Sequence, residues 1–187
     1  MANYQRCFLD CNFNEFQKGT GWLEKPTSKA QMEIEHYLYL LNPINKKILV
    51  VGVGNGRFGL TYGLDESNTI DGITICEEEK ENAIELYYDK VYLINKYNPD
   101  TFNIDKYDII VDVNLKSYAC CDKHFKEYIY NILHSLKLQG HLYSHKDGFT
   151  YDTTGVGFYE QKDDDYIKEL GFNINYMDNI LDIERIK

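Results

Sequence analysis

The chain has 187 residues, of which 43% are hydrophobic and 27% charged, the balance of an ordinary globular protein. Its formal net charge is −10, with lysines scattered among Asp and Glu, which disfavours a nucleic-acid partner and suits a neutral or cationic small molecule. No apolar run is long enough to span a membrane and the first residues do not resemble a signal peptide. We therefore expect a cytoplasmic protein, and the length suits a single domain over residues 1–187.

Residues 1–26 precede the first periodic segment, and "FQKGTGWLEKP" (16–26) places two glycines beside the only tryptophan. We interpret this stretch as a lid segment in which Lys18 or Trp22 lines a pocket and contacts the substrate. The alternative is a Trp22 that packs against the sheet. A leading helix is predicted within residues 27–45, because apolar residues recur at near-helical spacing after Thr27 or Ser28 as a cap.

The remaining segments alternate between strand and helix patterns. Strands are predicted at 46–53, 68–76, 90–94, 107–115, 140–145, 172–178 and 180–186, and helices at 57–64, 77–89, 123–140 and 163–172. This order predicts an α/β fold for residues 46–187: a doubly wound, mostly parallel sheet of about seven strands, with helices on both faces. The last two strands are predicted to form a C-terminal antiparallel hairpin.

Five cysteines occur along these segments, at positions 7, 11, 76, 120 and 121. An odd count in a cytosolic protein argues against a disulfide framework. Their spacing matches no standard zinc site, so we expect free thiols and no metal.

The glycine-rich stretch "ILVVGVGNGRFG" (48–59) follows the first predicted strand of the sheet. A dinucleotide fingerprint would need a third glycine where Arg57 stands, and no "GK[ST]" follows as a triphosphate loop requires. Gly52, Gly54 and Gly56 would let a cofactor lie against the backbone, and amide groups at the start of the next helix favour a carboxylate. A purely structural role, in which the glycines only let a helix approach the sheet, is the alternative.

Together with four later segments, this loop resembles the class I (Rossmann-like) S-adenosylmethionine-dependent methyltransferases. The later segments are "GITICEEEKENA", "YDIIVDVNL", "ILHSLKLQGHLYSH" and "YIKELGFNI", which follow the order of the family over residues 46–187. The resemblance implies S-adenosyl-L-methionine as cofactor. The positions it implies for cofactor binding are Gly52, Val53, Gly54, Asn55, Gly56, Thr74, Ile75, Glu77 and Asn114.

Two positions depart from the pattern of that family, which often has acids where this chain has Val50 and Thr74. The string "GITICEE" is similar to the same segment in the branch of the family that contains the cyclopropane fatty-acid synthases. In that branch a threonine is common at the position of Thr74. Glu77 or Glu78 could supply the missing carboxylate, or could simply match the positive end of the helix dipole.

Methyl transfer is an in-line displacement, so an enzyme mainly aligns the acceptor and excludes water, and an oxygen or amine acceptor also needs a base. His145 and Asp112, which follow the fifth and fourth strands of the parallel part, are the candidate catalytic residues. A structural role for His145 and a loop-capping role for Asp112 are the alternatives. His124 and Asp147 join Lys18 and Trp22 as candidates for substrate binding.

We therefore predict an S-adenosylmethionine-dependent methyltransferase that acts on a small molecule such as a sugar, a nucleotide-sugar or another metabolite. No nucleic acid or membrane partner is expected, and a homodimer is left open. One alternative is an aminopropyl transferase on the same fold, although only Asp112 is acidic in "DVNLKSY". The other is a non-catalytic cofactor-binding subunit of a partner enzyme, which the residues Val50 and Thr74 leave open.

Overall fold

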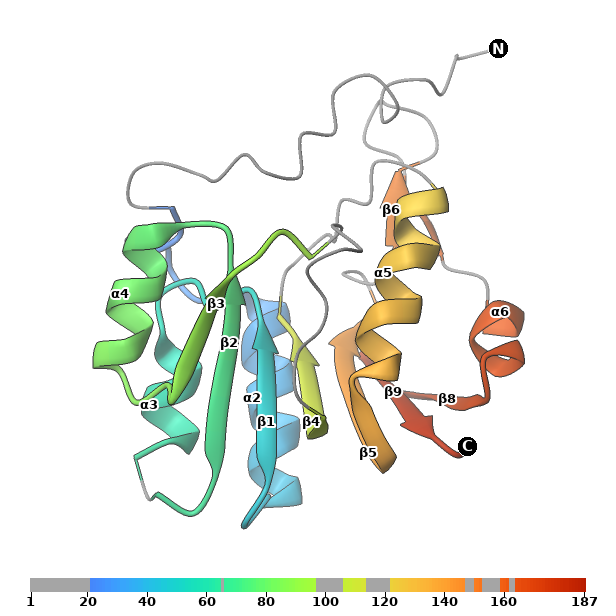
Figure 1. The fold of residues 1–187 in the computed structure, drawn as a ribbon, viewed down its shortest axis with the longest axis horizontal. Helices are drawn as coiled ribbons and strands as arrows, with labels where there is room; N and C mark the ends of the chain where they lie inside the picture. The colour runs from blue at the N-terminus through green and yellow to red at the C-terminus, as the bar shows by residue number, and fades with distance from the viewer. Residues whose placement is uncertain are drawn as a thin grey trace.

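β1 (Lys47–Val51) is an interior strand of the sheet, and four of its five residues are buried, as expected for a strand covered on both faces. The computed structural model describes residues 21–64, 66–96, 106–113, 122–146, 150–152, 159–161 and 164–187. In these ranges seven strands form one sheet, in the order β3-β2-β1-β4-β5-β9-β8 (Figure 1). The other six are β2 (Thr69–Thr74), β3 (Lys90–Leu93), β4 (Tyr107–Asp112), β5 (Leu136–His145), β8 (Phe172–Met177) and β9 (Ile180–Arg185).

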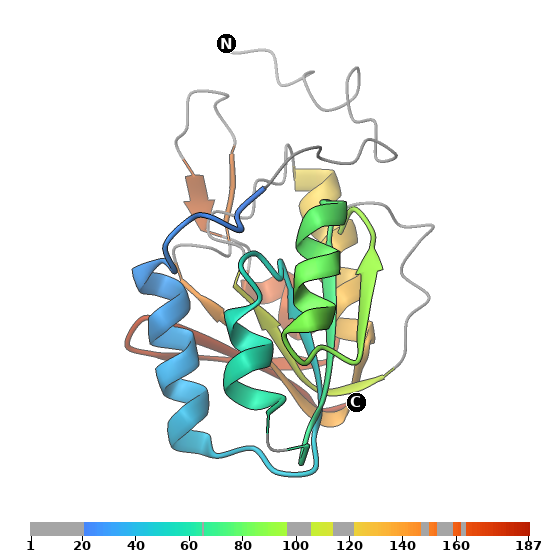
Figure 2. The same cartoon turned by 90° about the vertical axis from the view of Figure 1, so that its left-hand side faces the viewer.

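Strands β1 to β5 run parallel, whereas β9 is antiparallel to both β5 and β8. The helices α2 (Lys29–Leu41), α3 (Arg57–Tyr62) and α4 (Glu77–Glu85) cover one face of the sheet (Figures 1 and 2). The helices α5 (Asp122–His134) and α6 (Asp164–Glu169) cover the other. Each face has its own buried apolar cluster, so the predicted doubly wound fold with a C-terminal antiparallel hairpin is confirmed.

The helix predicted over 123–140 is wrong at its C-terminal end, because α5 ends at His134 and β5 begins at Leu136. Leu136 pairs with Tyr107 of β4, and the register between these strands then shifts before Ile109 pairs with His141. Gly140 lies inside the strand, where a Cβ atom would come within 3.0 Å of the Tyr107 carbonyl oxygen. Pairing with β4 therefore replaces the last helical turn that the sequence suggests.

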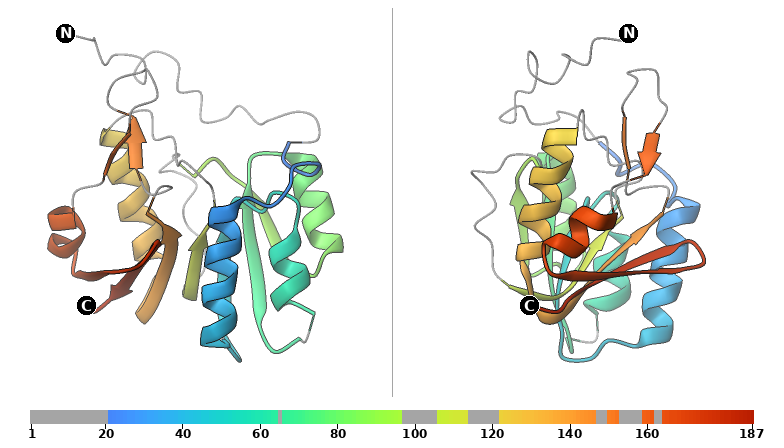
Figure 3. Two further views of the ribbon diagram at one scale, coloured as in Figure 1. Left: turned by 180° about the vertical axis from the view of Figure 1, so that it is seen from behind. Right: turned by 90° about the vertical axis from the view of Figure 1, so that its right-hand side faces the viewer.

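A short antiparallel pair, β6 (Thr150–Asp152) and β7 (Tyr159–Gln161), follows β5 and was not predicted from the sequence. It stands beyond the carboxyl end of the large sheet (Figure 3). Across the described ranges, no helix has both the length and the apolar character needed to cross a membrane.

Candidate functional site

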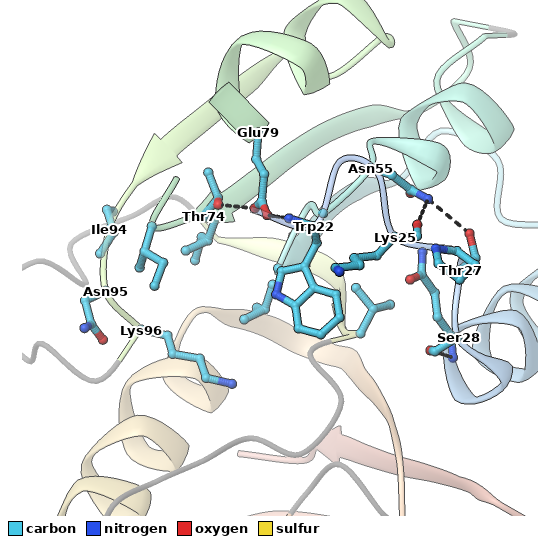
Figure 4. Close-up of a pocket in the computed structure, with 18 residues that line it drawn as sticks. Trp22, Lys25, Thr27, Ser28, Asn55, Thr74, Glu79, Ile94, Asn95 and Lys96 are labelled. Atoms are coloured by element: carbon cyan, nitrogen blue, oxygen red, sulfur yellow. Dashed lines mark hydrogen bonds between the residues drawn. The ribbon is translucent and has the colours of Figure 1, made fainter. Parts of the chain in front are cut away.

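The pocket of interest lies at the carboxyl ends of the parallel strands, where the strand order reverses between β1 and β4. Ligands of doubly wound sheets bind at such a switch point. The pocket encloses about 280 Å³ (Figure 4). Its lining residues are Trp22, Lys25, Pro26, Thr27, Ser28, Gln31, Val51, Gly52, Gly54, Asn55, Ile73, Thr74, Ile75, Glu79, Ile94, Asn95, Lys96 and Val113.

The glycine loop after β1 provides part of this lining. Gly52 and Gly54 line the pocket with φ values of 86° and 50°, in the left-handed region that side chains disfavour. Gly56, with a φ of 75°, instead packs against α4, where a Cβ atom would come within 2.7 Å of Leu86 Cδ1. Val53 is buried in the core on the same face. The predicted loop residues therefore divide between those that face the pocket and those that support it.

Asn55 and Arg57 tie the loop to the segment in front of α2. The Asn55 amide donates to Thr27 Oγ1 over 3.2 Å and accepts from the Arg57 backbone amide over 3.3 Å. The Arg57 guanidinium, which stands where a dinucleotide loop would have glycine, donates to the buried Glu35 of α2 over 2.9 Å. Arg57 is thus directed to a helix, and its charge is compensated there.

A buried carboxylate lies beside Thr74, one of the positions where the family often has an acid. The Thr74 hydroxyl donates to Glu79 Oε2 over 2.6 Å and accepts from the Cys76 amide over 3.1 Å. Glu79 Oε1 accepts the Trp22 backbone amide over 2.7 Å. Glu79 comes from the first turn of α4 and lines the pocket. The carboxylate beside Thr74 therefore comes from α4, whereas an acid at position 74 would have come from β2.

The glutamate predicted from the sequence for this role, Glu77, is exposed and pairs with Lys80 over 2.9 Å. Glu78 accepts from the Cys76 thiol over 3.3 Å. The sequence contained a signal that we missed: Glu79 and Ala83 are four residues apart on one helix face, and both are buried. That spacing marks Glu79 as the inward-facing member of the three glutamates.

Residues 21–28, which we call the strap, run along one side of the pocket, and the Trp22 side chain reaches over the cavity (Figure 4). At one end Gly21, with a φ of 53°, packs so closely against Glu79 that a Cβ atom would overlap the carboxylate. At the other end Thr27 accepts the Asn55 amide. The Trp22 side chain lines the pocket and remains 61% exposed, so it covers the cavity without entering the core.

A buried charged cluster closes the pocket on the side of β4. The Tyr128 hydroxyl of α5 donates to Asp112 Oδ2 over 2.6 Å, and Lys96 Nζ lies 3.7 Å from the same oxygen. Lys96 also lies over the Tyr128 ring, 4.8 Å from its centre. Burial lowers the pKa of Lys96, and Asp112 acts in the opposite direction. Lys96 lines the pocket, whereas Asp112 lies behind it.

The candidate base His145 lies elsewhere in the described structure. Its Nε2 atom is 3.0 Å from Glu33 Oε2 of α2, which also accepts from Asn179 in the β8–β9 turn over 3.0 Å. His145 is buried and is not among the described residues that line the pocket. These contacts join α2 to the C-terminal hairpin.

Of the other predicted site residues, one lines the pocket and the rest have no described side chain. Ile75 lines the pocket. Lys18, Asn114 and Asp147 lie outside the described residues, and His124 belongs to α5 without a described side chain. Considering only the described parts of the chain, no three His, Cys, Asp or Glu side chains gather as a metal site.

Neither a protein-family model nor a curated protein sequence matches the chain. Solved structures do match, among them a TehB-like SAM-dependent methyltransferase from Corynebacterium glutamicum, with a TM-score of 0.60 and 14% identity over 82% of this chain and 87% of that one. The N-methyltransferase NodS from Bradyrhizobium japonicum, in complex with S-adenosyl-L-homocysteine, has a TM-score of 0.60 and 14% identity over 89% and 95% of the two chains.

Magnesium protoporphyrin IX methyltransferase (ChlM) from Synechocystis, with bound SAM, has a TM-score of 0.56 and 12% identity over 82% of this chain and 76% of that one. At such identities the likeness shows the fold. The chain has the fold of the class I SAM-dependent methyltransferases.

Proposed function

We propose that the protein is an S-adenosylmethionine-dependent methyltransferase that acts on a small molecule such as a sugar, a nucleotide-sugar or another metabolite. The observation that carries this proposal is the pocket at the switch point of the sheet, where Gly52 and Gly54 leave the backbone open. The same edge of the sheet offers backbone, hydroxyl, carboxylate and apolar groups together. A ligand with an amino-acid end, a ribose and an aromatic base can use each of these.

The residues present fit that cofactor. Gly52, Gly54 and Asn55 would hold its amino-acid end, because no Cβ atom of the two glycines intrudes there. Thr74 and Glu79 would hold the ribose hydroxyls, since the carboxylate is a strong hydrogen-bond acceptor. The apolar side chains of Ile73, Ile75, Ile94 and Val113 would enclose the base. When bound, S-adenosylmethionine supplies a methyl group on a positively charged sulfur.

The proposed substrate class follows from the strap and from the net charge. The strap lines one side of the pocket with Trp22 over the cavity, so a small acceptor enters more easily than a polymer. A formal net charge of −10 repels nucleic acid. In the cytoplasm, where we place the protein, the chain's own residues would align the acceptor and exclude water, with Trp22 over the cavity.

The alternative of a non-catalytic cofactor-binding subunit rested on the missing acids at Val50 and Thr74. Glu79 weakens that argument, because its carboxylate lies 2.6 Å from the Thr74 hydroxyl. Val50 is fully buried in the core, so an acid there would itself need a partner. We therefore keep the methyltransferase as the single proposed function.

Calorimetry with S-adenosylmethionine and S-adenosylhomocysteine tests this proposal, with ATP and NAD as controls. In the variant Gly52→Ala, a methyl group enters the pocket lining, so we expect the cofactor affinity to fall by about tenfold or more. The matched control is Gly171→Ala, because Gly171 has a φ of 88° against 86° for Gly52 and lies in the turn before β8. Both variants should lose about 1–2 kcal/mol of stability from backbone strain.

Equal cofactor affinity in Gly52→Ala and Gly171→Ala would place the cofactor elsewhere. No binding of either cofactor form at about 1 mM would reject the proposed function. Turnover is then tested with a panel of sugars, nucleotide-sugars and other metabolites, by mass spectrometry for the methylated product. Cofactor binding without any product, together with a co-purifying enzyme, would favour the subunit alternative.

A further inference from the structure

Lys96 is a buried lysine in the lining of a pocket that we assign to a positively charged cofactor. Its side chain is 8% exposed, and Figure 4 shows it reaching from the end of β3 toward α5. A lysine is rarely buried to this degree unless it is paired. Its burial therefore depends on the neighbouring groups that compensate its charge.

The charged and titratable groups around Lys96 come from several elements. Asp112 of β4 forms the ion pair, and Tyr128 of α5 donates to the same carboxylate oxygen while its ring lies beneath the ammonium group. Glu79 of α4 and Lys25 of the strap line the same pocket. Asp112 is fully buried behind Lys96, so of this pair the ammonium group is the one that meets a ligand.

We propose that Lys96 is the proton acceptor of the transfer reaction, and that entry of the sulfonium form of the cofactor displaces its proton. This inference rests on the proposed function. A cation in the same pocket repels the ammonium form, and burial disfavours that form already, as the lowered pKa indicates. Asp112 and Tyr128 hold the side chain in place, and neutral Lys96 then carries a free electron pair.

Neutral Lys96 accounts for the proton that the acceptor atom loses during methyl transfer. As the lone pair of an acceptor oxygen or nitrogen bonds to the methyl carbon, the carbon–sulfur bond breaks and its electron pair stays on sulfur. Lys96 Nζ takes the proton that the acceptor atom loses, and becomes ammonium beside a sulfur that is now neutral. The charge that repelled this proton has gone, so Lys96 and Asp112 form an ion pair again. The acceptor class is thereby narrowed to hydroxyl and amine groups that carry a proton.

Cofactor binding alone tests the displacement of the proton, without knowledge of the acceptor. S-adenosylmethionine and S-adenosylhomocysteine form a matched pair, because they differ in the methyl group and the sulfur charge. Heats of binding measured in two buffers of different ionisation enthalpy give the number of protons released. From neutral to mildly alkaline pH, we expect S-adenosylmethionine to release up to about one proton more than S-adenosylhomocysteine.

Three variants assign that proton to a residue. Lys96→Met should abolish the difference in proton release between the two ligands. Lys96→Arg retains the charge and cannot lose it, so it should also release no proton, and it should bind S-adenosylmethionine less well relative to S-adenosylhomocysteine. Lys25→Met removes the other lysine found among the described lining residues, and should leave proton release unchanged.

Proton release that is the same for both ligands, or that persists in Lys96→Met and Lys96→Arg, would overturn the inference. If Lys96→Met does not fold, Lys96→Arg gives the same decision, because it keeps the ion pair with Asp112. Failure of either ligand to bind the wild-type protein would instead contradict the proposed function, so the two failures are distinguishable.

Discussion

The carboxylate of Glu79 connects the strap to the sheet, and its replacement by glutamine is the sharpest test of how the pocket is held together. Glu79 Oε1 accepts the Trp22 amide over 2.7 Å, and Oε2 accepts the Thr74 hydroxyl over 2.6 Å. In Glu79→Gln, one oxygen remains as an acceptor and the other position becomes an NH₂ donor. One of the two partners therefore loses its acceptor within a buried site.

The size of the effect follows from these contacts. A hydrogen bond to a charged group contributes about 1.5–3 kcal/mol, so Glu79→Gln should lower the free energy of unfolding by about that amount. Glu77→Gln is the matched control, because Glu77 lies in the same first turn of α4 and is exposed. Its pair with Lys80 is on the surface and should contribute about 0.2–1 kcal/mol.

Urea denaturation followed by circular dichroism measures both free energies. Trp22 is the only tryptophan, so acrylamide quenching of its fluorescence reports on the strap itself. We expect Glu79→Gln to increase quenching and Glu77→Gln to leave it unchanged. If the two variants have the same stability and the same quenching, the strap is not held by Glu79 and the argument fails.

Two further predictions concern packing and pH. Gly59→Ala should destabilise the protein by about 1–3 kcal/mol despite the better helix propensity of alanine, because the Cβ atom would overlap the Leu86 carbonyl oxygen. The control Leu60→Ala, at an exposed position, should change stability by about 0.5 kcal/mol or less. Equal melting temperatures of the two variants would contradict this prediction. The hydrogen bond that the His141 ring donates to Asp182 raises the pKa of His141 above its ordinary value of 6.5, so this pair stabilises the fold fully below that value. The stabilisation is lost as the pH rises through the higher folded pKa. The stability lost in His141→Gln should therefore be larger at about pH 5.5 than at about pH 9 in denaturation experiments, and a loss that does not change with pH would refute the assignment.

The parts of the fold that depend on local pattern were predictable. The apolar run at β1 identified a strand covered on both faces, and the glycines after it identified a loop that leaves the backbone open to a ligand. The helix at 123–140 failed because Leu133 and Leu136 continue a helical spacing. Only the pairing of Leu136 with Tyr107 of β4 decides that the chain turns there, and that contact is not local.

The site was predictable to the same extent. Thr74 is the last residue of β2 and the glycine loop follows β1 directly, so strand prediction located them. To choose Glu79 over Glu77, one must know which face of α4 is buried. Ala83, one helical turn after Glu79, indicates that face. Lys96 gave no local signal, because its partner Asp112 lies on β4, beyond β2 and β1 in the order of the sheet.

The place of β9 between β5 and β8 affects how the protein is made. During synthesis, one edge of β5 stays unpaired until β9 has been made, because β9 follows β5 by about 40 residues in the chain. At about 5–20 residues per second, synthesis leaves that edge unpaired for about 2–8 s. An open strand edge invites pairing with other chains, so a growing polypeptide is most prone to aggregation in this interval. Slower translation of the region between β5 and β9 should therefore reduce the soluble yield.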